Sequence, residues 1–139
     1  MSGPVVTLTM PAKADYLILA RLALAGISRA VAIDPETLAD LKLAVTEACA
    51  NAVRHAYGAE GGQVTVSYRV DGGLLAVQVE DEGTGFDVGR VGEWVPEELD
   101  EAGMGLSIIR SVVDELEVER GTDGRGTRLR LEKRLAAAG

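Results

Sequence analysis

The sequence predicts an α+β fold, an α/β sandwich in which helices cover one face of a mixed, mostly antiparallel sheet. Apolar residues recur at helical spacing in some segments, while other apolar runs alternate or are rich in β-branched residues. The predicted order is strand, two helices, two strands, an irregular segment, one helix and two strands. Helices and strands therefore do not alternate strictly. This order argues against the doubly wound arrangement of dinucleotide-binding domains.

The composition is typical of a soluble globular chain, and residues 1–139 are expected to form one domain. Because the formal net charge is -8, nucleic acid phosphates would repel the chain, and a basic protein partner suits it better. The single cysteine, Cys49, excludes an internal disulfide and a cysteine-rich zinc site. The sequence shows neither a signal peptide nor a membrane span, so a cytoplasmic location is expected.

The N-terminal segment is expected to form one strand and one helix. Val5 to Met10 alternates weakly and is rich in β-branched residues, which predicts a strand that Pro11 ends. Leucines and alanines at helical spacing predict a helix from Ala12 to Ala25, ending near Gly26.

A long helix is expected in the middle of the chain. Asp34 can serve as its N-cap, and Pro35 suits the first helical position. The helical spacing continues through LKLAVTEACANAVRHAY, residues 41–57, and Gly58 breaks it. One side of this helix carries residues that can fill a core, namely Leu41, Val45, Ala48, Cys49, Ala52 and Ala56.

The same helix carries a row of polar residues. Glu47, Asn51 and His55 follow each other at steps of four, so they lie on one face. Burying any of these groups without a partner is costly. The row therefore either faces water without a function or lines a functional cleft.

Two strands and an irregular segment are expected next. Val64 to Val70 alternates, and Asp71-Gly72-Gly73 predicts a tight hairpin turn before a strand from Leu74 to Val79. The segment from Gly83 to Gly103 has little periodicity. An irregular stretch of this length inside a domain is usually functional or mobile.

The C-terminal part is expected to form a helix and a closing hairpin. The helix is predicted from Leu106 to Leu116. The hairpin strands are predicted from Glu117 to Arg120 and from Thr127 to Glu132, around a glycine-containing turn. Together with the preceding hairpin, these strands favour a largely antiparallel sheet.

Two glycine-containing motifs flank the irregular segment. Asp81 follows a strand and precedes Gly83 and Gly85, while Gly103-Met104-Gly105-Leu106 is expected to open a helix. Each motif alone is typical of a turn that needs positive φ. The functional alternative is that backbone N–H groups at the start of the helix hold phosphates. Asp81 could then accept a hydrogen bond from the exocyclic amine of a base.

In combination, these motifs resemble the four boxes of the GHKL ATPase superfamily, whose domains have the Bergerat ATP-binding fold. The boxes are Glu47-x3-Asn51-x3-His55, Asp81-x-Gly83-x-Gly85, Gly103-x-Gly105 and Gly126-Thr127, in this order. More narrowly, LAVTEACANAVRHAY, VEDEGTGFD and GMGLSIIRSVVDELE resemble the bacterial anti-sigma factor serine-protein kinases that govern partner switching. The resemblance covers nearly the whole chain.

The resemblance implies ATP and Mg²⁺ as cofactors and a role for each matched residue. Glu47 would be the general base, and Asn51 would coordinate Mg²⁺ through its side-chain oxygen. Asp81 would read the adenine amino group, with Thr127 helping through a water. His55 would lie near the phosphate end or pack as a helix-end residue. Gly83 and Gly85 would line the base, and the phosphates would meet Gly103, Met104, Gly105 and Leu106.

The resemblance also implies a function and partners. The protein would be an anti-sigma factor that phosphorylates a serine or threonine of an anti-anti-sigma (STAS) protein and thereby regulates a sigma factor. The alternative is a non-catalytic ATP-binding module that binds a protein partner. Glu47 favours the enzyme, because nucleotide binding alone needs only Asn51, the glycines and Asp81.

Two further expectations concern the lid and the oligomer. Some family members carry an arginine just before the second glycine box, where this chain has Asp100-Glu101-Ala102, so ATP binding is more strongly implied than efficient turnover. The family commonly forms homodimers through an apolar surface near the first helix. Core burial explains the candidate residues equally well, and these are Tyr16, Leu17, Leu19 and Leu24.

Overall fold

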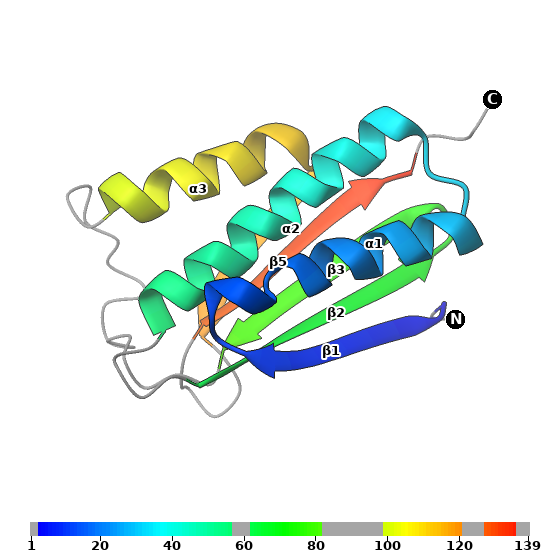
Figure 1. Ribbon diagram of the computed structural model, residues 1–139. Helices are drawn as coiled ribbons and strands as arrows, with labels where there is room; N and C mark the ends of the chain where they lie inside the picture. The colour runs from blue at the N-terminus through cyan, green and yellow to red at the C-terminus, as the bar shows by residue number, and fades with distance from the viewer. Residues whose placement is uncertain (1–2, 57–61, 82–98, 121–126, 136–139) are drawn as a thin grey trace.

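The computed structural model describes residues 3–56, 62–81, 99–120 and 127–135 (Figure 1). Helices and strands follow each other in the predicted order. They are β1 (Val5–Pro11), the short 3₁₀ helix η1 (Ala14–Tyr16), α1 (Ile18–Ala30), α2 (Pro35–Ala56), β2 (Gln63–Asp71), β3 (Leu74–Asp81), α3 (Leu99–Val112), β4 (Glu115–Arg120) and β5 (Thr127–Arg134). The predicted α+β class is confirmed.

The described strands form one sheet with the order β1-β2-β3-β5-β4. Each neighbouring pair of these strands is antiparallel. Figure 1 shows α1, α2 and α3 over the same face of this sheet, and no described helix covers the other face, which we call the open face. The predicted sandwich with helices on one face is therefore confirmed.

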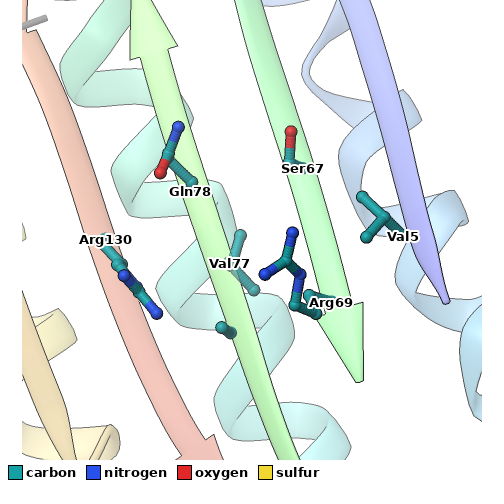
Figure 2. A pocket seen from close by; sticks show the side chains of 7 residues that line it. Val5, Ser67, Arg69, Val77, Gln78 and Arg130 are labelled. Atoms are coloured by element: carbon teal, nitrogen blue, oxygen red, sulfur yellow. The ribbon is translucent and has the colours of Figure 1, made fainter. Parts of the chain in front are cut away.

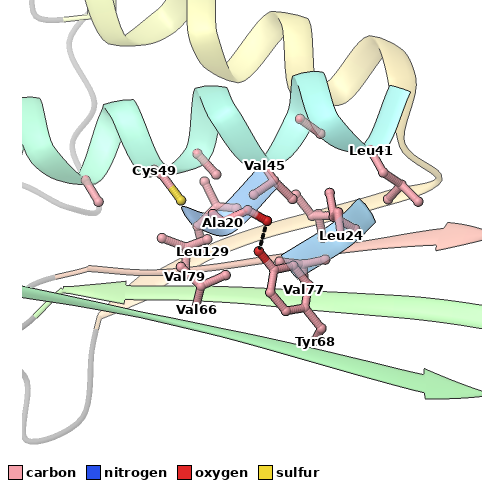
Figure 3. Close-up of a cluster of buried hydrophobic side chains, with 14 of the residues drawn as sticks. Ala20, Leu24, Leu41, Val45, Cys49, Val66, Tyr68, Val77, Val79 and Leu129 are labelled. Carbon is pink, nitrogen blue, oxygen red and sulfur yellow. Dashed lines mark hydrogen bonds between the residues drawn. The ribbon is translucent and has the colours of Figure 1, made fainter. Parts of the chain in front are cut away.

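The core lies between the sheet and the helices. Alternate residues of β2 and β3 point into it, as the period of two in their sequences predicts. The Tyr68 hydroxyl donates a hydrogen bond of 2.6 Å to the carbonyl oxygen of Ala20, which ties β2 to α1 (Figure 3). Burial raises the pKa of Tyr68 and raises that of the Cys49 thiol to about 12, so Cys49 is a protonated core residue at neutral pH. The predicted core side of α2 is buried at Leu41, Val45, Ala48, Cys49 and Ala52, and the side chain of Ala56 lies outside the described residues.

The first helix differs from the prediction at both ends. It begins at Ile18 after the 3₁₀ turn and runs through Gly26 to Ala30. Ile27 is buried in the core while Gly26 is exposed, so the glycine weakens the helix locally without ending it. Burial of the next apolar residue outweighs the stop signal.

The start of α2 is as predicted. The backbone N–H of Thr37 donates a hydrogen bond of 3.2 Å to Oδ2 of Asp34, which is the contact an N-cap makes. Hydrogen bonds from the side chain and backbone of Thr37 lower the pKa of Asp34. The β2–β3 turn is also as predicted, with φ of 56° at Gly72 and 85° at Gly73.

The C-terminal elements are shifted relative to the prediction. Helix α3 covers Leu99–Val112 instead of residues 106–116, and β4 already begins at Glu115. Leu116 pairs with Leu131 of β5 and packs against the core, which places the end of the predicted helix in the sheet instead. Strands β3 and β5 each extend two residues beyond their predicted ends.

Candidate functional site

The polar row on α2 faces inward at its centre. Asn51 is 7% exposed, and its Oδ1 has no hydrogen-bond partner among the described residues. Glu47, one turn earlier, is half-buried. His55 lies in the last turn of α2, but its side chain is outside the described part of the chain. Because a buried amide oxygen without a partner is costly, Oδ1 of Asn51 is a candidate contact for a ligand.

Asp81 lies at the end of β3, as predicted, and is 3% exposed. Its Oδ1 accepts a hydrogen bond of 3.3 Å from the backbone N–H of Thr127, the first residue of β5. The antiparallel pairing of β3 with β5 brings these two residues together across 46 positions of sequence. The structure thus joins two residues that the sequence assigns to one adenine-reading function.

The second glycine box lies against Glu47. Gly105 is buried in α3, and a Cβ added to it would lie 3.2 Å from Oε2 of Glu47. Leu106 is partly buried and packs against the core. Helix α3 therefore places one residue of the predicted phosphate cradle beside the predicted base.

The prediction that Gly103-Met104-Gly105 opens a helix is wrong, since these residues lie in the second turn of α3. In an α-helix only the first four N–H groups lack an internal partner, so the free donors of this helix precede Gly103. Asp100 and Glu101 suit the first turn of a helix because of its dipole. The helix begins at Leu99, before the glycines, which lower its stability without ending it.

The site residues converge on one end of the molecule. The C-terminal ends of α2 and β3 and the N-terminal ends of α3 and β5 lie at the same end in Figure 1. Helix α2 contacts α3, β3 and β5, and β3 pairs with β5. The Gly83 and Gly85 predictions fall outside the described residues, as do Gly126 and the side chain of Met104.

Asn51 is suited to hold Mg²⁺. An amide oxygen is a ligand that Mg²⁺ accepts, and the unpartnered Oδ1 is the kind of atom that such an ion would satisfy. Within the described ranges, no group of three or more His, Cys, Asp or Glu residues could hold a metal. Magnesium commonly keeps several water ligands and binds phosphate oxygens, so a single amide oxygen from the protein is compatible with it.

The open face of the sheet carries a separate hollow of about 210 Å³ (Figure 2). It is lined by Val5, Ser67, Arg69, Ala76, Val77, Gln78 and Arg130. Figure 2 shows Arg69 and Arg130 on either side of β3, away from the helices. Another hollow, of about 580 Å³, borders the Gly72-Gly73 turn. Neither hollow includes Glu47, Asn51 or Asp81.

Residues 10–133 match the family model of the histidine kinase-like ATPase domain. The chain belongs to this family. The resemblance to the GHKL ATPases is thereby confirmed. None of the described helices is long and apolar enough to cross a membrane.

Relatives within the histidine kinase-like ATPase family are more specific. The chain is 39% identical over 122 residues to the serine-protein kinase RsbW of Listeria innocua, covering 81% of this chain and 78% of that protein. It is 36% identical over 124 residues to the serine-protein kinase RsbW of Bacillus licheniformis, covering 82% of this chain and 77% of the relative. The chain is therefore a member of the ATP-dependent serine-protein kinases of this family.

A solved structure supports the fold. The chain is similar to the crystal structure of the RsbU and RsbW domains of a Mycobacterium tuberculosis protein, with a TM-score of 0.71 and 24% identity. The similarity covers 95% of this chain and 32% of that longer chain. At this identity the comparison establishes that both share the fold.

The structure also changes the predicted apolar surface. Leu24 is fully buried and Leu17 packs against the core, whereas Tyr16 and Leu19 are exposed. The most exposed apolar side chains of α1 are Ile18 and Leu22, at 56% and 57%, and the sequence interpretation missed both. Their spacing of four is the signal that identifies them, since it places them on a face of α1 different from buried Ala20, Leu24 and Ile27.

Proposed function

We propose that this protein uses Mg-ATP to phosphorylate a serine or threonine of an anti-anti-sigma (STAS) protein in the cytoplasm. In this proposal the protein also binds a sigma factor, and it retains the sigma factor when the STAS protein is phosphorylated. Membership of the kinase family and the RsbW relatives support the class of reaction. The observation that carries the proposal is the placement of Glu47 one turn from Asn51, with its unpartnered buried oxygen.

The described residues suit distinct parts of phosphoryl transfer. Asn51 would hold Mg²⁺, which neutralises phosphate charge when bound. Glu47 would orient the attacking hydroxyl and accept its proton as the oxygen bonds to the terminal phosphorus and ADP leaves. Asp81 would accept a hydrogen bond from the adenine amino group, with Thr127 holding that carboxylate through its backbone N–H. Guanine has an acceptor at that position, so ATP would be preferred over GTP.

A second candidate function is a non-catalytic ATP-binding module that shapes a protein-binding surface. The observation in its favour is the acidic run Asp100-Glu101-Ala102, at positions where some kinases of this type have an arginine. Carboxylates beside a triphosphate repel it unless a cation intervenes. This candidate shares the nucleotide site and lacks only the transfer step.

The experiment that separates the two candidates is incubation with labelled ATP, Mg²⁺ and a panel of STAS proteins. Wild-type protein is expected to label one of them on serine or threonine, while Glu47→Ala binds ATP with similar affinity and transfers nothing. Unlabelled GTP should compete poorly. Normal transfer by Glu47→Ala would remove Glu47 as the base, and ATP binding by wild type without any transfer would favour the module.

We also propose a homodimer in which the exposed apolar side chains of α1 meet a second copy. Ile18, Leu22, Tyr16 and Leu19 form this surface, and Leu24 does not contribute because it is buried. Association would remove these side chains from water. Ile18→Glu combined with Leu22→Glu is expected to shift the protein from dimer to monomer in sedimentation equilibrium. A wild-type monomer at the same concentration would contradict the proposal.

A further inference from the structure

Gly105 occupies a position where its backbone gives no reason for glycine. It lies inside α3, and its φ falls outside the left-handed region that favours glycine. Glycine is less favourable than alanine in a helix interior. The reason for glycine at this position must therefore lie in what surrounds the missing side chain.

The surroundings of Gly105 are specific. A Cβ at this position would lie 3.2 Å from Oε2 of Glu47, which is tighter than nine in ten real Cβ contacts. Gly26 in α1 offers a direct contrast, because a Cβ there would meet nothing within 4 Å. Of these two helical glycines, Gly105 is therefore the crowded one.

The carboxylate is the part of this contact that can yield. One turn after Gly105, Ile109 is fully buried and anchors α3 in the core. On the other side, Ala48 and Cys49 are buried next to Glu47 and anchor α2. Two helices held in this way cannot separate easily, whereas the end of a glutamate side chain can rotate away.

We propose that Gly105 is a positioning residue for Glu47: the missing side chain leaves the space in which the carboxylate is held for the attacking hydroxyl. This inference rests on the proposed function of Glu47 as the base. A methyl group at residue 105 displaces the carboxylate by a few tenths of an ångström. Positioning of that accuracy matters for phosphoryl transfer, which depends mainly on geometry and charge.

The first measurement tests the contact without using activity. Gly26→Ala should raise the Tm by about 2–5 °C, because alanine favours a helix and meets no neighbour there. Gly105→Ala should give a smaller rise or a fall in wild type. In the Glu47→Ala background, the same substitution should raise the Tm as much as Gly26→Ala does. Equal Tm shifts from Gly105→Ala in wild type and in Glu47→Ala would show that residue 105 does not meet the Glu47 carboxylate, and would overturn the proposal.

The second measurement tests the positioning of the Glu47 carboxylate. It compares the turnover of phosphate transfer to a STAS protein at saturating ATP with the calorimetric dissociation constant for Mg-ATP. Gly105→Ala should lower turnover about tenfold while the dissociation constant changes less than about threefold. Glu47→Asp withdraws the carboxylate from residue 105, so adding Gly105→Ala to it should cause no further loss of turnover. Gly26→Ala should leave turnover and affinity unchanged.

Each result has a defined meaning. Loss of affinity with unchanged turnover at saturation would overturn the proposal and leave Gly105 as a nucleotide contact only. Equal turnover losses from Gly105→Ala with Glu47 and with Asp at position 47 would overturn it as well. If wild type transfers no phosphate, the proposed function fails, and the Tm comparison still decides whether Gly105 determines the position of the Glu47 carboxylate.

Discussion

The two faces of the sheet use neighbouring residues of the same strands for different purposes. Tyr68 and Val77 point into a core that the helices cover, while Ser67 and Gln78 point to the open side (Figures 2 and 3). Removal of apolar surface from water stabilises the covered face. The open face carries exposed polar contacts, which contribute little to the free energy of unfolding.

Two buried polar residues on the helix side depart from this division. Asn51 and Asp81 lie among apolar residues, and Oδ1 of Asn51 has no partner within the described structure. Asp81 accepts a hydrogen bond from the backbone N–H of Thr127, whereas a buried amide oxygen without a partner lowers stability. The comparison therefore separates the apolar core from Asn51, whose buried amide oxygen is the atom that the proposed function assigns to a ligand.

The largest effect is expected from removing core volume. Leu131→Ala should lower the free energy of unfolding by about 3 kcal/mol, because it empties a fully buried position of β5. The adjacent Arg130→Ala, on the open face, should change it by less than about 0.5 kcal/mol. Urea denaturation of both variants measures this difference, and similar losses from the two would show that the faces do not divide as described.

The next effect concerns the exception at Asn51. Asn51→Leu should weaken Mg-ATP binding by about a hundredfold or more and raise the free energy of unfolding by about 1 kcal/mol. Calorimetry with Mg²⁺ and after chelation provides the control, since chelation should weaken binding by wild type much more than by the variant. A destabilised variant that binds normally would assign Asn51 to packing.

A smaller effect is expected for the hydrogen bond between β2 and α1. Tyr68→Phe should lower the free energy of unfolding by about 1–2 kcal/mol, because the buried carbonyl of Ala20 loses its 2.6 Å partner. Ser67→Ala is the matched change on the open face, where the Ser67 hydroxyl makes an exposed contact of 3.4 Å with the Thr7 hydroxyl. Its effect on thermal unfolding should be close to zero.

The smallest effect is expected from the ion pair across β4 and β5. Nη1 of Arg128 lies 3.3 Å from Oε1 of Glu119, whose side chain is half exposed to solvent. A double-mutant cycle with Arg128→Ala and Glu119→Ala should give a coupling of about 0.5 kcal/mol that decreases at high salt. A coupling above about 2 kcal/mol would mean that the open face is not as solvated as its ion pairs suggest.

Local signals made most of the fold predictable. The Asp34-Pro35 start of α2 and the Gly72-Gly73 turn were predicted correctly, because their geometry depends on a few adjacent residues. The ends of α1 and α3 were not, because glycines that normally stop helices are outweighed by burial of Ile27 and by helix-favouring residues before Gly103. Tertiary packing decides where these helices end, and the residues adjacent in sequence do not reveal that packing.

The membership of the candidate site stays a prediction, while the structure adds contacts between some of its residues. The family resemblance implies one function for Asp81 and Thr127, and the structure joins them by a hydrogen bond. The contact of Gly105 with Glu47 was not predictable, since it depends on how α3 packs on α2. The roles of Gly83 and Gly85 remain predictions from the sequence.

The strand order has a consequence for how the chain folds. Strands β2 and β3 meet through a turn of two residues, whereas Thr7 of β1 reaches Ser67 of β2 across 60 positions. The loop that this contact closes contains α1 and α2, and its closure costs more conformational entropy than closure of the short hairpin turn. From sequence separation alone, we expect the β2–β3 hairpin to form before β1 adds to the edge of the sheet.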